Sequence, residues 1–282
     1  MVFQYSRICQ VIKSHQNLPI HPALTPYVKS IDIELFNPNT TADALSYRVL
    51  PDFFVVLGFQ CGGSLYILEQ DTKRQLFHCG ISGMQTQYRI FQPETVDTKT
   101  VLVTLYPWSI NAFFREDAYQ FTNQALGLTE IIKRSPVLDV EEQLNPITEP
   151  SELACMVQRF LLNLLKTNKA QLPPPAIINL VQQFPCLDTT LSVEQLAKKY
   201  AMSKRSLERK LKSMIGISPK QFLRLSQFRQ TLQQIQNGAH WEYLIDHLNY
   251  YDQAHIINSF KQFSGFTPGQ FHAAHIALST KI

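Results

Sequence analysis

The sequence predicts an α+β protein whose first half is rich in strands and whose second half is helical. Residues 46–105 are rich in β-branched and aromatic side chains and are interrupted by glycines, a pattern typical of short strands. Residues 176–282 carry apolar side chains at helical spacing, with capping residues ahead of the expected helices. Pro173–Pro175 separates the two patterns, and consecutive prolines cannot continue a helix. We therefore expect a domain of residues 1–170, a proline-rich linker of residues 171–175 and a domain of residues 176–282.

The composition is that of a globular chain. Its 282 residues are 45% hydrophobic and 17% charged, and the length suffices for two domains with separate cores. No apolar run reaches the length of a transmembrane helix, and Met1–Arg7 lacks the basic-then-apolar order of a signal peptide. We therefore expect a cytoplasmic protein.

The five cysteines are scattered without Cys-x-x-Cys spacing, which favours reduced thiols. This pattern predicts no disulfide framework, no metal site and no other cofactor.

Charge is distributed unevenly between the two halves. Residues 1–175 hold 14 Lys and Arg against 16 Asp and Glu, a net charge of −2, whereas residues 176–282 hold 12 against 6, a net charge of +6. Residues 196–229 contain ten basic side chains and a single acidic one, Glu208. A local basic excess of this kind favours a polyanionic partner such as nucleic acid.

The strand-like segments of the first half predict a small β-barrel or sandwich of cupin-like type. These segments are Tyr47–Phe59, Gly63–Leu68 and Thr100–Tyr106. Short helices are expected from Ser109 onward and over residues 125–133. The clearest helix of this half, Glu152–Lys166, carries a broad apolar stripe that we expect to pack on the barrel, with pairing to a second subunit as the alternative.

Capping signals divide the second half into successive helices. Ser192 and Gln195 form a capping box, and Ser203 is placed to cap the next helix. Ser218-Pro219 opens a long helix that Asn237-Gly238 ends. The expected helices are residues 176–183, 193–200, 203–214, 220–236, 241–248 and 252–263, and a last one that begins at Thr267-Pro268.

The helical half contains an internal repeat. Gly216–Phe222 (Gly-Ile-Ser-Pro-Lys-Gln-Phe) and Gly265–Phe271 (Gly-Phe-Thr-Pro-Gly-Gln-Phe) match at an offset of 49 residues, and Ser203 falls on Asp252. At this offset one apolar stripe also falls on the other: Leu207, Leu211 and Met214 on Ile256, Phe260 and Phe263. Agreement of stripe, cap and turn favours duplication over chance, and it predicts two helix-turn-helix units joined by the long helix.

Over about residues 176–276 the chain resembles the DNA-binding domain of AraC-type transcriptional regulators. The matching motifs are Leu196-Ala197-x3-Ala201-Met-Ser-x-Arg-x-Leu-x-Arg209, Gly216-Ile-Ser-Pro-Lys-Gln-Phe222, Tyr250-Tyr-Asp-Gln-Ala-His-Ile256, Phe260-Lys261 and Gly265-Phe-Thr-Pro268. The run Tyr-Tyr-Asp-Gln-Ala-His and the segment Arg48-Val-Leu-Pro-Asp52 resemble one subgroup of that family. The resemblance implies a sequence-specific regulator of promoter DNA whose N-terminal domain senses a small molecule, dimerises, or both.

The same resemblance implies which residues face DNA. In the first unit Arg205, Glu208 and Arg209 occupy groove-facing positions, where Arg suits guanine and Glu suits cytosine, although Glu208 can equally orient a neighbouring arginine. Phosphate contacts are expected from Lys204, Lys212 and Lys220. The matching positions of the second unit are Gln253, Ala254, Ile257 and Asn258, followed by the basic Lys261. Ile257 suits either a thymine methyl group or the edge of the core.

We expect the two units to contribute unequally. The family usually has Ala where Ile245 stands and Gly where Asn249 stands. Asn is the best substitute for Gly at a left-handed turn, so the fold should survive. The basic residue often found late in the second recognition helix is here Asn258. Residues 240–276 hold one basic residue, Lys261, against three acidic ones, so the first unit should dominate.

The effector is left open by the sequence. The strand region holds five polar or aromatic side chains suited to line a pocket: Arg48, Asp52, His78, Tyr88 and Phe91. A structural Arg48–Asp52 pair is the favoured alternative for two of them.

A rival interpretation of the whole protein is a metal- or cysteine-dependent enzyme, such as a DNA-repair methyl transferase, fused to a DNA-binding domain. It needs a His/Glu ligand set or clustered Cys and His residues, which the sequence lacks, so we expect no enzymatic activity. A protein that coats nucleic acid without sequence preference is the second rival.

Overall fold

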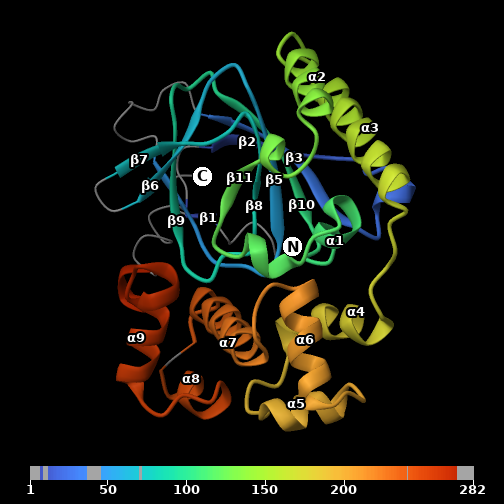
Figure 1. The fold of residues 1–282 in the computed structure, drawn as a ribbon. Coiled ribbons are helices and arrows are strands. Elements are labelled where there is room, and N and C mark those ends of the chain that lie inside the picture. Colours follow the sequence, from blue (N-terminus) through green and yellow to red (C-terminus); the bar gives the residue numbers. More distant parts are fainter. Residues whose placement is uncertain (1–6, 9–11, 37–45, 70–71, 240, 272–282) are drawn as a thin grey trace.

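The computed structural model describes all residues except 1–6, 9–11, 37–45, 70–71, 240 and 272–282. A sheet-rich half stacks on a helical half, and the chain segment after α3 connects them along one side (Figure 1). The strands of the sheet-rich half are β1 (Arg7–Ile8), β2 (Ile12–Leu18), β3 (Val28–Phe36), β4 (Tyr47–Val49), β5 (Val55–Cys61), β6 (Leu65–Glu69), β7 (Thr72–Gln75), β8 (Cys79–Ser82), β9 (Arg89–Pro93), β10 (Lys99–Leu105) and β11 (Ala125–Gly127).

These strands form two antiparallel sheets. One sheet has the order β1-β4-β9-β6-β7, and the other has the order β11-β8-β5-β10-β3-β2. No strand pairing joins the sheets within the described residues. Of the two expected architectures, a barrel or a sandwich, the structure therefore has the sandwich-like one, in which the sheets face each other without closing.

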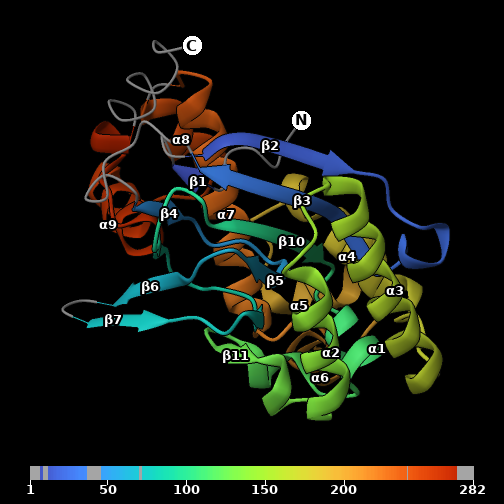
Figure 2. The ribbon, with the colours of Figure 1, turned by 90° about the horizontal axis from the view of Figure 1, so that it is seen from above.

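The main core lies on the outer face of the six-stranded sheet. Alternate residues of β5, Val55, Leu57 and Phe59, are fully buried, as pleating requires when one face is packed. The Phe59 ring meets the Phe160 ring of α3 (Pro150–Asn168) edge to face, with centroids 6.1 Å apart. Figure 2 shows α2 (Arg134–Leu144) and α3 on the side of this sheet that lies away from β6 and β7. The expected packing of the 152–166 helix against the strands is thus observed.

The inner face of the same sheet is polar. Glu34, Gln60 and Thr100 are buried there, out of phase with the apolar residues of their strands. Gln60 connects the two sheets, because its Oε1 accepts a hydrogen bond from the Leu65 amide (2.7 Å) and its Nε2 donates to the Phe77 carbonyl (2.8 Å). The facing surfaces of the two sheets are therefore held by polar contacts beside one small apolar cluster around Tyr47 and Leu65.

Several elements of the sheet-rich half differ from expectation. Strands β1, β2 and β3 precede the segment in which strands were expected. Residues 125–133 form β11 and a single 3₁₀ turn (Leu128–Glu130), so the expected helix there was wrong. Instead, Ala125–Gly127 pairs antiparallel with β8, with Gly127 opposite Gly80. The helix expected from Ser109 is α1 (Ser109–Phe114), whereas α2 was not expected.

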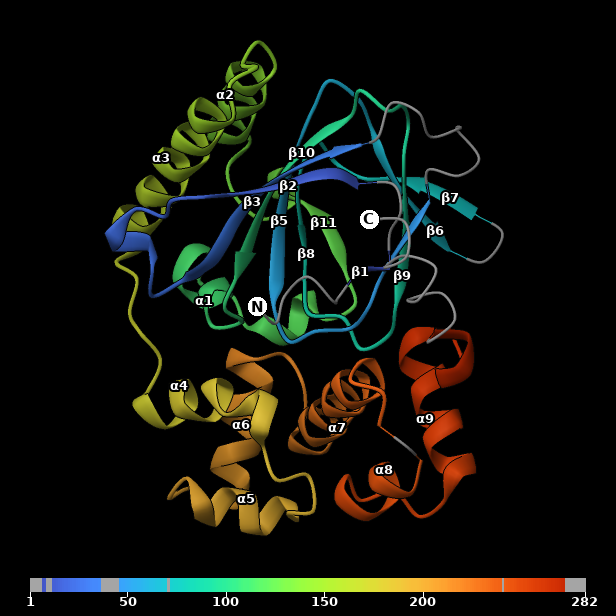
Figure 3. The same ribbon diagram turned by 180° about the vertical axis from the view of Figure 1, so that it is seen from behind.

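The helical half follows the expected pattern closely. It consists of α4 (Pro175–Gln182), α5 (Val193–Lys199), α6 (Lys204–Met214), α7 (Pro219–Gln236), α8 (Trp241–His247) and α9 (Gln253–Ser264). The capping box of Ser192 and Gln195 is present, and a second one joins Ser218 to Gln221. The helix expected from Thr267-Pro268 is helical through residue 271 and then passes outside the described residues. Helices α6 and α9 stand on either side of α7 (Figures 1 and 3).

Backbone conformation confirms the repeat. Ala201 and Asn249, which occupy matching turns, both have positive φ, 52° and 57°. The turns that end the two recognition helices match as well, with left-handed Gly216 (φ 100°) and Gly265 (φ 72°). Each unit therefore needs the same two left-handed residues, and Asn249 adopts the conformation expected of a glycine substitute.

Both helix-ending turns dock on the sheet-rich half, and we call these sites the first and second docking contacts. At the first, Thr122 donates from Oγ1 to the Gly216 carbonyl (2.8 Å), and Ser213 bonds to Asp117. At the second, the Tyr88 amide donates to the Phe263 carbonyl (3.0 Å).

Arg48 completes the second docking contact. Its Nη1 donates to the Ser264 carbonyl (3.0 Å), and its guanidinium carbon lies 3.7 Å from the centre of the Phe266 ring and 4.5 Å from that of Tyr88. Burial lowers the pKa of Arg48, yet the carbonyl and the two ring faces compensate the charge at this interface.

Between the two contacts, Asp52 and Arg229 form an ion pair at 3.4 Å, with side chains only 14% and 11% exposed. Beside the pair, the Phe53 ring packs on Phe184 of the helical half, with centroids 4.4 Å apart. Breaking one partner of such a shielded pair leaves the other charge poorly solvated. The two halves therefore share one continuous core, and the helical units are held in a set orientation.

A glycine comparison tests the second docking contact. In Gly265→Ala the new Cβ would lie 2.5 Å from the Tyr88 ring, whereas in Gly238→Ala, at a similar φ of 78°, it would meet nothing within 4 Å. We expect Gly238→Ala to lower the free energy of unfolding by about 1–2 kcal/mol through backbone strain alone. Gly265→Ala should cost roughly 1–3 kcal/mol more, because the interface is overpacked. Denaturant unfolding of both variants measures this, and equal losses would show that the contact is not tight.

Candidate nucleic-acid interface

Helix α6 presents its charged side chains on the surface that its apolar stripe leaves free. Leu207 and Leu211 are completely buried. Ser203 accepts a hydrogen bond from the Ser206 amide (3.1 Å), so the first turn is capped as expected. The exposed residues of the helix include all of its sequence-predicted DNA contacts: Lys204, Arg205, Glu208, Arg209 and Lys212.

The two ends of α6 have different surroundings. At the C-terminal end Lys212 lies over the Tyr119 ring of the sheet-rich half, 5.0 Å from its centre. At the N-terminal end Lys204 pairs with Glu194 of α5 at 2.6 Å. This hydrogen bond raises the pKa of Lys204 and lowers that of Glu194, but both groups are exposed, and such pairs contribute little. A phosphate can therefore compete for Lys204 easily, while Lys212 faces the sheet-rich half.

Helix α9 presents a less charged surface. Its cap Asp252 accepts a hydrogen bond from the His255 amide (2.7 Å), and Ile256 and Phe260 are completely buried. The sequence-predicted contacts of this unit are exposed except one: Gln253, Ala254, Asn258 and Lys261 are exposed, and Ile257 is half-buried. Ile257 therefore lies at the edge of the core with part of its surface free. Lys220, at the first turn of α7, is exposed as well.

Tyr251 is a candidate contact that the sequence reasoning missed. Its side chain is 89% exposed, next to the α9 cap, whereas the ring of its neighbour Tyr250 is buried. The Tyr250 hydroxyl hydrogen-bonds to Thr231 Oγ1 (2.8 Å), so the two tyrosines of the Tyr-Tyr-Asp run have separate tasks. An exposed aromatic residue beside a recognition-helix N-terminus is suited to contact DNA. The adjacent tyrosines were a visible signal, but only burial tells which ring is free.

Comparison with known proteins places the helical half in a family. Residues 196–274 match the family model of a helix-turn-helix domain. This segment is an AraC-type helix-turn-helix domain. With it, the chain is a DNA-binding transcriptional regulator.

The chain also resembles solved structures at low identity. ToxT from Vibrio cholerae matches with 10% identity and a TM-score of 0.43, covering 87% of this chain and 99% of that chain. ToxT from strain SCE256 with a bound unsaturated fatty acid matches with 8% identity and a TM-score of 0.42, covering 87% and 95%. The AraC-like activator CuxR matches with 14% identity and a TM-score of 0.28, covering 74% and 78%. No curated protein matches the chain.

Three of the five residues suggested for an effector pocket lie at or beside the docking contacts. Arg48 and Tyr88 form the second docking contact, and Asp52 pairs with Arg229. His78 is exposed, and Phe91 stacks on Tyr47 in the five-stranded sheet with centroids 5.7 Å apart. The structure thus does not bring the five together at one place. Arg48 and Asp52 each bond to the helical half, while the alternative was that they pair with each other.

The described cysteines are free thiols. Cys61 and Cys79 are buried, and Cys155 and Cys186 are exposed. Burial raises the pKa of Cys61 to about 11 and raises that of Cys79 too, so both thiols are protonated at neutral pH and lack the thiolate that alkyl transfer needs. The described residues contain no group of three or more His, Cys, Asp and Glu that could hold a metal ion. No helix in the described part of the chain has both the length and the apolarity to cross a membrane.

The charge difference between α6 and α9 gives a ranked prediction. We expect Arg209→Ala to weaken specific binding by about 1–3 kcal/mol, because an exposed guanidinium suited to guanine is lost. Asn258→Ala should cost less binding free energy, since the Asn258 amide is uncharged and makes weaker contacts with DNA than the guanidinium of Arg209. Gel shifts on a selected operator at one fixed salt concentration measure both, and the reverse ranking would mean that α9 is the dominant reader.

Tyr251 gives a second prediction. Tyr251→Phe removes only the hydroxyl, which we expect to weaken operator binding by about 0.5–1.5 kcal/mol through loss of one hydrogen bond to the DNA backbone. Tyr66→Phe, on strand β6 of the sheet-rich half, is the matched control and should leave binding unchanged. Both variants should unfold like the original chain, as judged by thermal denaturation. Unchanged binding in Tyr251→Phe would remove this residue from the interface.

Proposed function

We propose that the chain reads operator DNA mainly through α6, with α9 as a second and weaker reader. The observation that carries this proposal is the contrast between the ends of α6. Its C-terminal turn docks on the sheet-rich half, while Arg205, Glu208 and Arg209 are exposed nearer the other end. In helix-turn-helix proteins, the N-terminal residues of the recognition helix contact base edges in the major groove. Glu208 reads cytosine or orients one of these arginines.

The two units bind successive major-groove faces on one side of the DNA. Helix α7 spans 18 residues between them and contacts both α6 and α9. Its Phe228 ring packs on the Phe260 and Phe263 rings of α9. A helix of that length is a spacer about 27 Å long. The two readers therefore act as one rigid body, and their footprints lie about one helical turn apart. Lys220 and Lys261 contribute phosphate attraction.

The sheet-rich half controls how the readers are presented. It contacts the terminal turn of each recognition helix, so a small molecule that shifts these contacts changes the affinity for DNA without touching DNA. Residues 1–170, 171–175 and 176–282 serve as sensing domain, linker and DNA-binding domain. The protein acts in the bacterial cytoplasm and catalyses no reaction.

A homodimer through α3 would allow the protein to bind two half-sites. The apolar stripe of α3 divides in two, because Leu153, Val157 and Leu161 are buried against the sheet-rich half, while Met156 and Leu164 remain partly exposed. These two form the surface that a second copy would cover.

Selection of bound DNA from genomic fragments, followed by hydroxyl-radical footprinting, tests the proposed function. We expect one enriched sequence with two protected windows on one face of the helix, spaced by about one turn. In Arg209→Ala the window under α6 should weaken first. Failure to enrich any sequence over random DNA would contradict the regulator, and would favour a protein that coats nucleic acid.

A further inference from the structure

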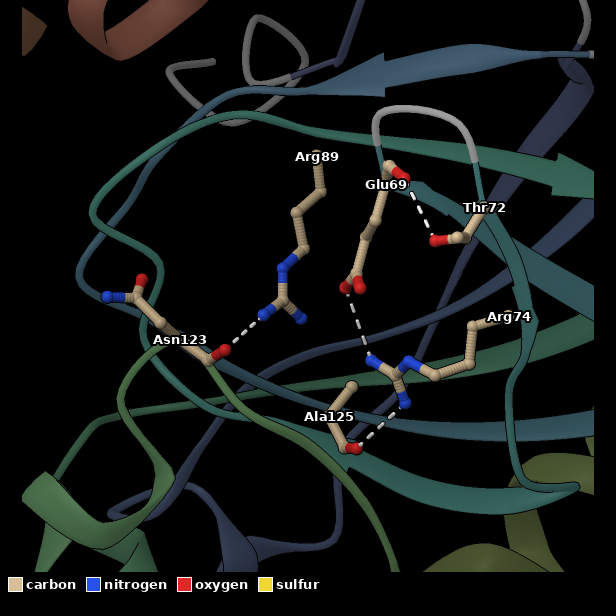
Figure 4. Close-up of polar contacts among 6 residues, drawn as sticks. All are labelled: Glu69, Thr72, Arg74, Arg89, Asn123 and Ala125. Carbon is tan, nitrogen blue, oxygen red and sulfur yellow. Dashed lines mark hydrogen bonds and ion pairs between the residues drawn. The ribbon is translucent and has the colours of Figure 1, made fainter.

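A pair of arginines faces inward beside the two docking contacts. Arg89 comes from β9 and Arg74 from β7, and both side chains point toward the same place as Glu69 at the end of β6 (Figure 4). The chain at Asn123 and Ala125 closes the opposite side. The group therefore sits between the five-stranded sheet and β11, the edge of the other sheet.

The charges of this group do not balance. Arg74 Nη2 lies 3.4 Å from Glu69 Oε1, and its Nη1 donates to the Ala125 carbonyl at 3.4 Å. Arg89 donates from Nη2 to the Asn123 carbonyl and makes no ion pair with any carboxylate in the described part of the chain. Two guanidinium groups thus lie near a single carboxylate, which among the described residues pairs with Arg74 alone and is about half exposed.

Arg89 also carries a donor without an acceptor. Its Nη1 is buried and makes no hydrogen bond in the part of the chain that the structure describes. Burial lowers the pKa of Arg89, and the charge of Arg74 acts in the same direction, while that of Glu69 opposes both. A buried guanidinium donor left unpaired is costly, and an oxyanion is the acceptor that satisfies its planar fork best.

The neighbours of Arg89 connect this place to both docking contacts. Tyr88, the preceding residue, donates its amide hydrogen to Phe263 at the end of α9. Asn123, which accepts from Arg89, follows Thr122, whose hydroxyl bonds to Gly216 at the end of α6. The Asn123 side chain also bonds to Thr86 (2.9 Å), so the two segments on either side of Arg89 are tied together. A ligand that displaces the Arg89 side chain therefore affects both the first and the second docking contact.

We propose that a small molecule bearing an oxyanion, either a carboxylate or a phosphate ester, binds between Arg89 and Arg74 and is the effector of this regulator. The oxyanion accepts from Arg89 Nη1 and neutralises the excess positive charge of the pair. Binding tightens the Asn123 and Tyr88 segments and so changes the presentation of α6 and α9. The inference rests on the proposed function, since it assigns the effector site of the same regulator.

Thermal unfolding of the full chain tests the binding step. The probes are inorganic phosphate and glycerol phosphate in one arm and acetate and hexanoate in the other, each at constant ionic strength against chloride. We expect one arm to raise the melting temperature in a saturable way, as preferential binding to the native state requires. The arm that responds decides between phosphate and carboxylate. No rise above chloride in either arm would overturn the proposal.

Arginine variants locate the binding. Arg89→Gln and Arg74→Gln should lose the rise in melting temperature, whereas Arg159→Gln, an exposed arginine on α3, should keep it. Arg74 is 41% exposed, so Arg74→Gln is expected to fold even if Arg89→Gln does not. An undiminished rise in Arg74→Gln, or in a folded Arg89→Gln, would place the anion elsewhere and overturn the assignment.

Operator binding separates this inference from the proposed function. The responding probe should change the operator affinity of the original chain by about fivefold or more, and the change should vanish in Arg74→Gln. If the chain binds its operator but no probe changes the affinity, only the effector site is wrong. If it binds no operator under any condition, the proposed function itself has failed.

Discussion

The arrangement of the two DNA-reading units depends on two glycine turns that fit against the sheet-rich half. Gly216 and Gly265 both have left-handed backbones, and a Cβ on either would lie 2.5 Å from an atom of Thr122 or Tyr88. The missing side chain therefore does two things at once: it allows the helix to end, and it allows the turn to approach its partner. Because both recognition helices end in this way, one surface sets the orientation of both.

The two helix-turn-helix units have the same backbone arrangement but expose different side chains. The caps Ser203 and Asp252, the left-handed turns and the buried stripes agree between the two, so the backbone of the duplicated unit is preserved. Helix α6 exposes two arginines and two lysines, whereas α9 exposes Gln253, Asn258 and a single lysine, with Tyr251 beside its cap. The first unit is thus suited to supply attraction and firm base contacts. The second is suited to refine register through polar and aromatic contacts.

Local features of the helical half could be predicted from the sequence because they are local in origin. Caps, apolar stripes and left-handed turns each depend on residues a few positions apart, and each of them occurs a second time in the repeat.

Contacts between residues far apart in the sequence could not be predicted in this way. Arg48 bonds to Ser264, 216 positions away, and Asp52 bonds to Arg229 rather than to its neighbour Arg48. Strand β3 was not predicted from the sequence, although Ile31 and Ile33 alternate with Asp32 and Glu34. All four residues are buried, whereas the acidic pair gave the segment the pattern of an exposed strand. The imbalance at Arg89 and the exposure of Tyr251 also depend on neighbours that only the fold brings near.

The docking of the helical half is tested most directly by hydrogen exchange at the Tyr88 amide in the full chain. This amide donates to the Phe263 carbonyl at the end of α9, so its exchange reports whether the second docking contact is closed. With the contact as described, the Tyr88 amide exchanges slowly in the free protein and faster when Arg48→Ala removes the guanidinium that holds Ser264. Exchange as fast as that of an exposed loop amide, and unchanged by Arg48→Ala, would contradict the claim that the sheet-rich half holds the DNA-reading units in place.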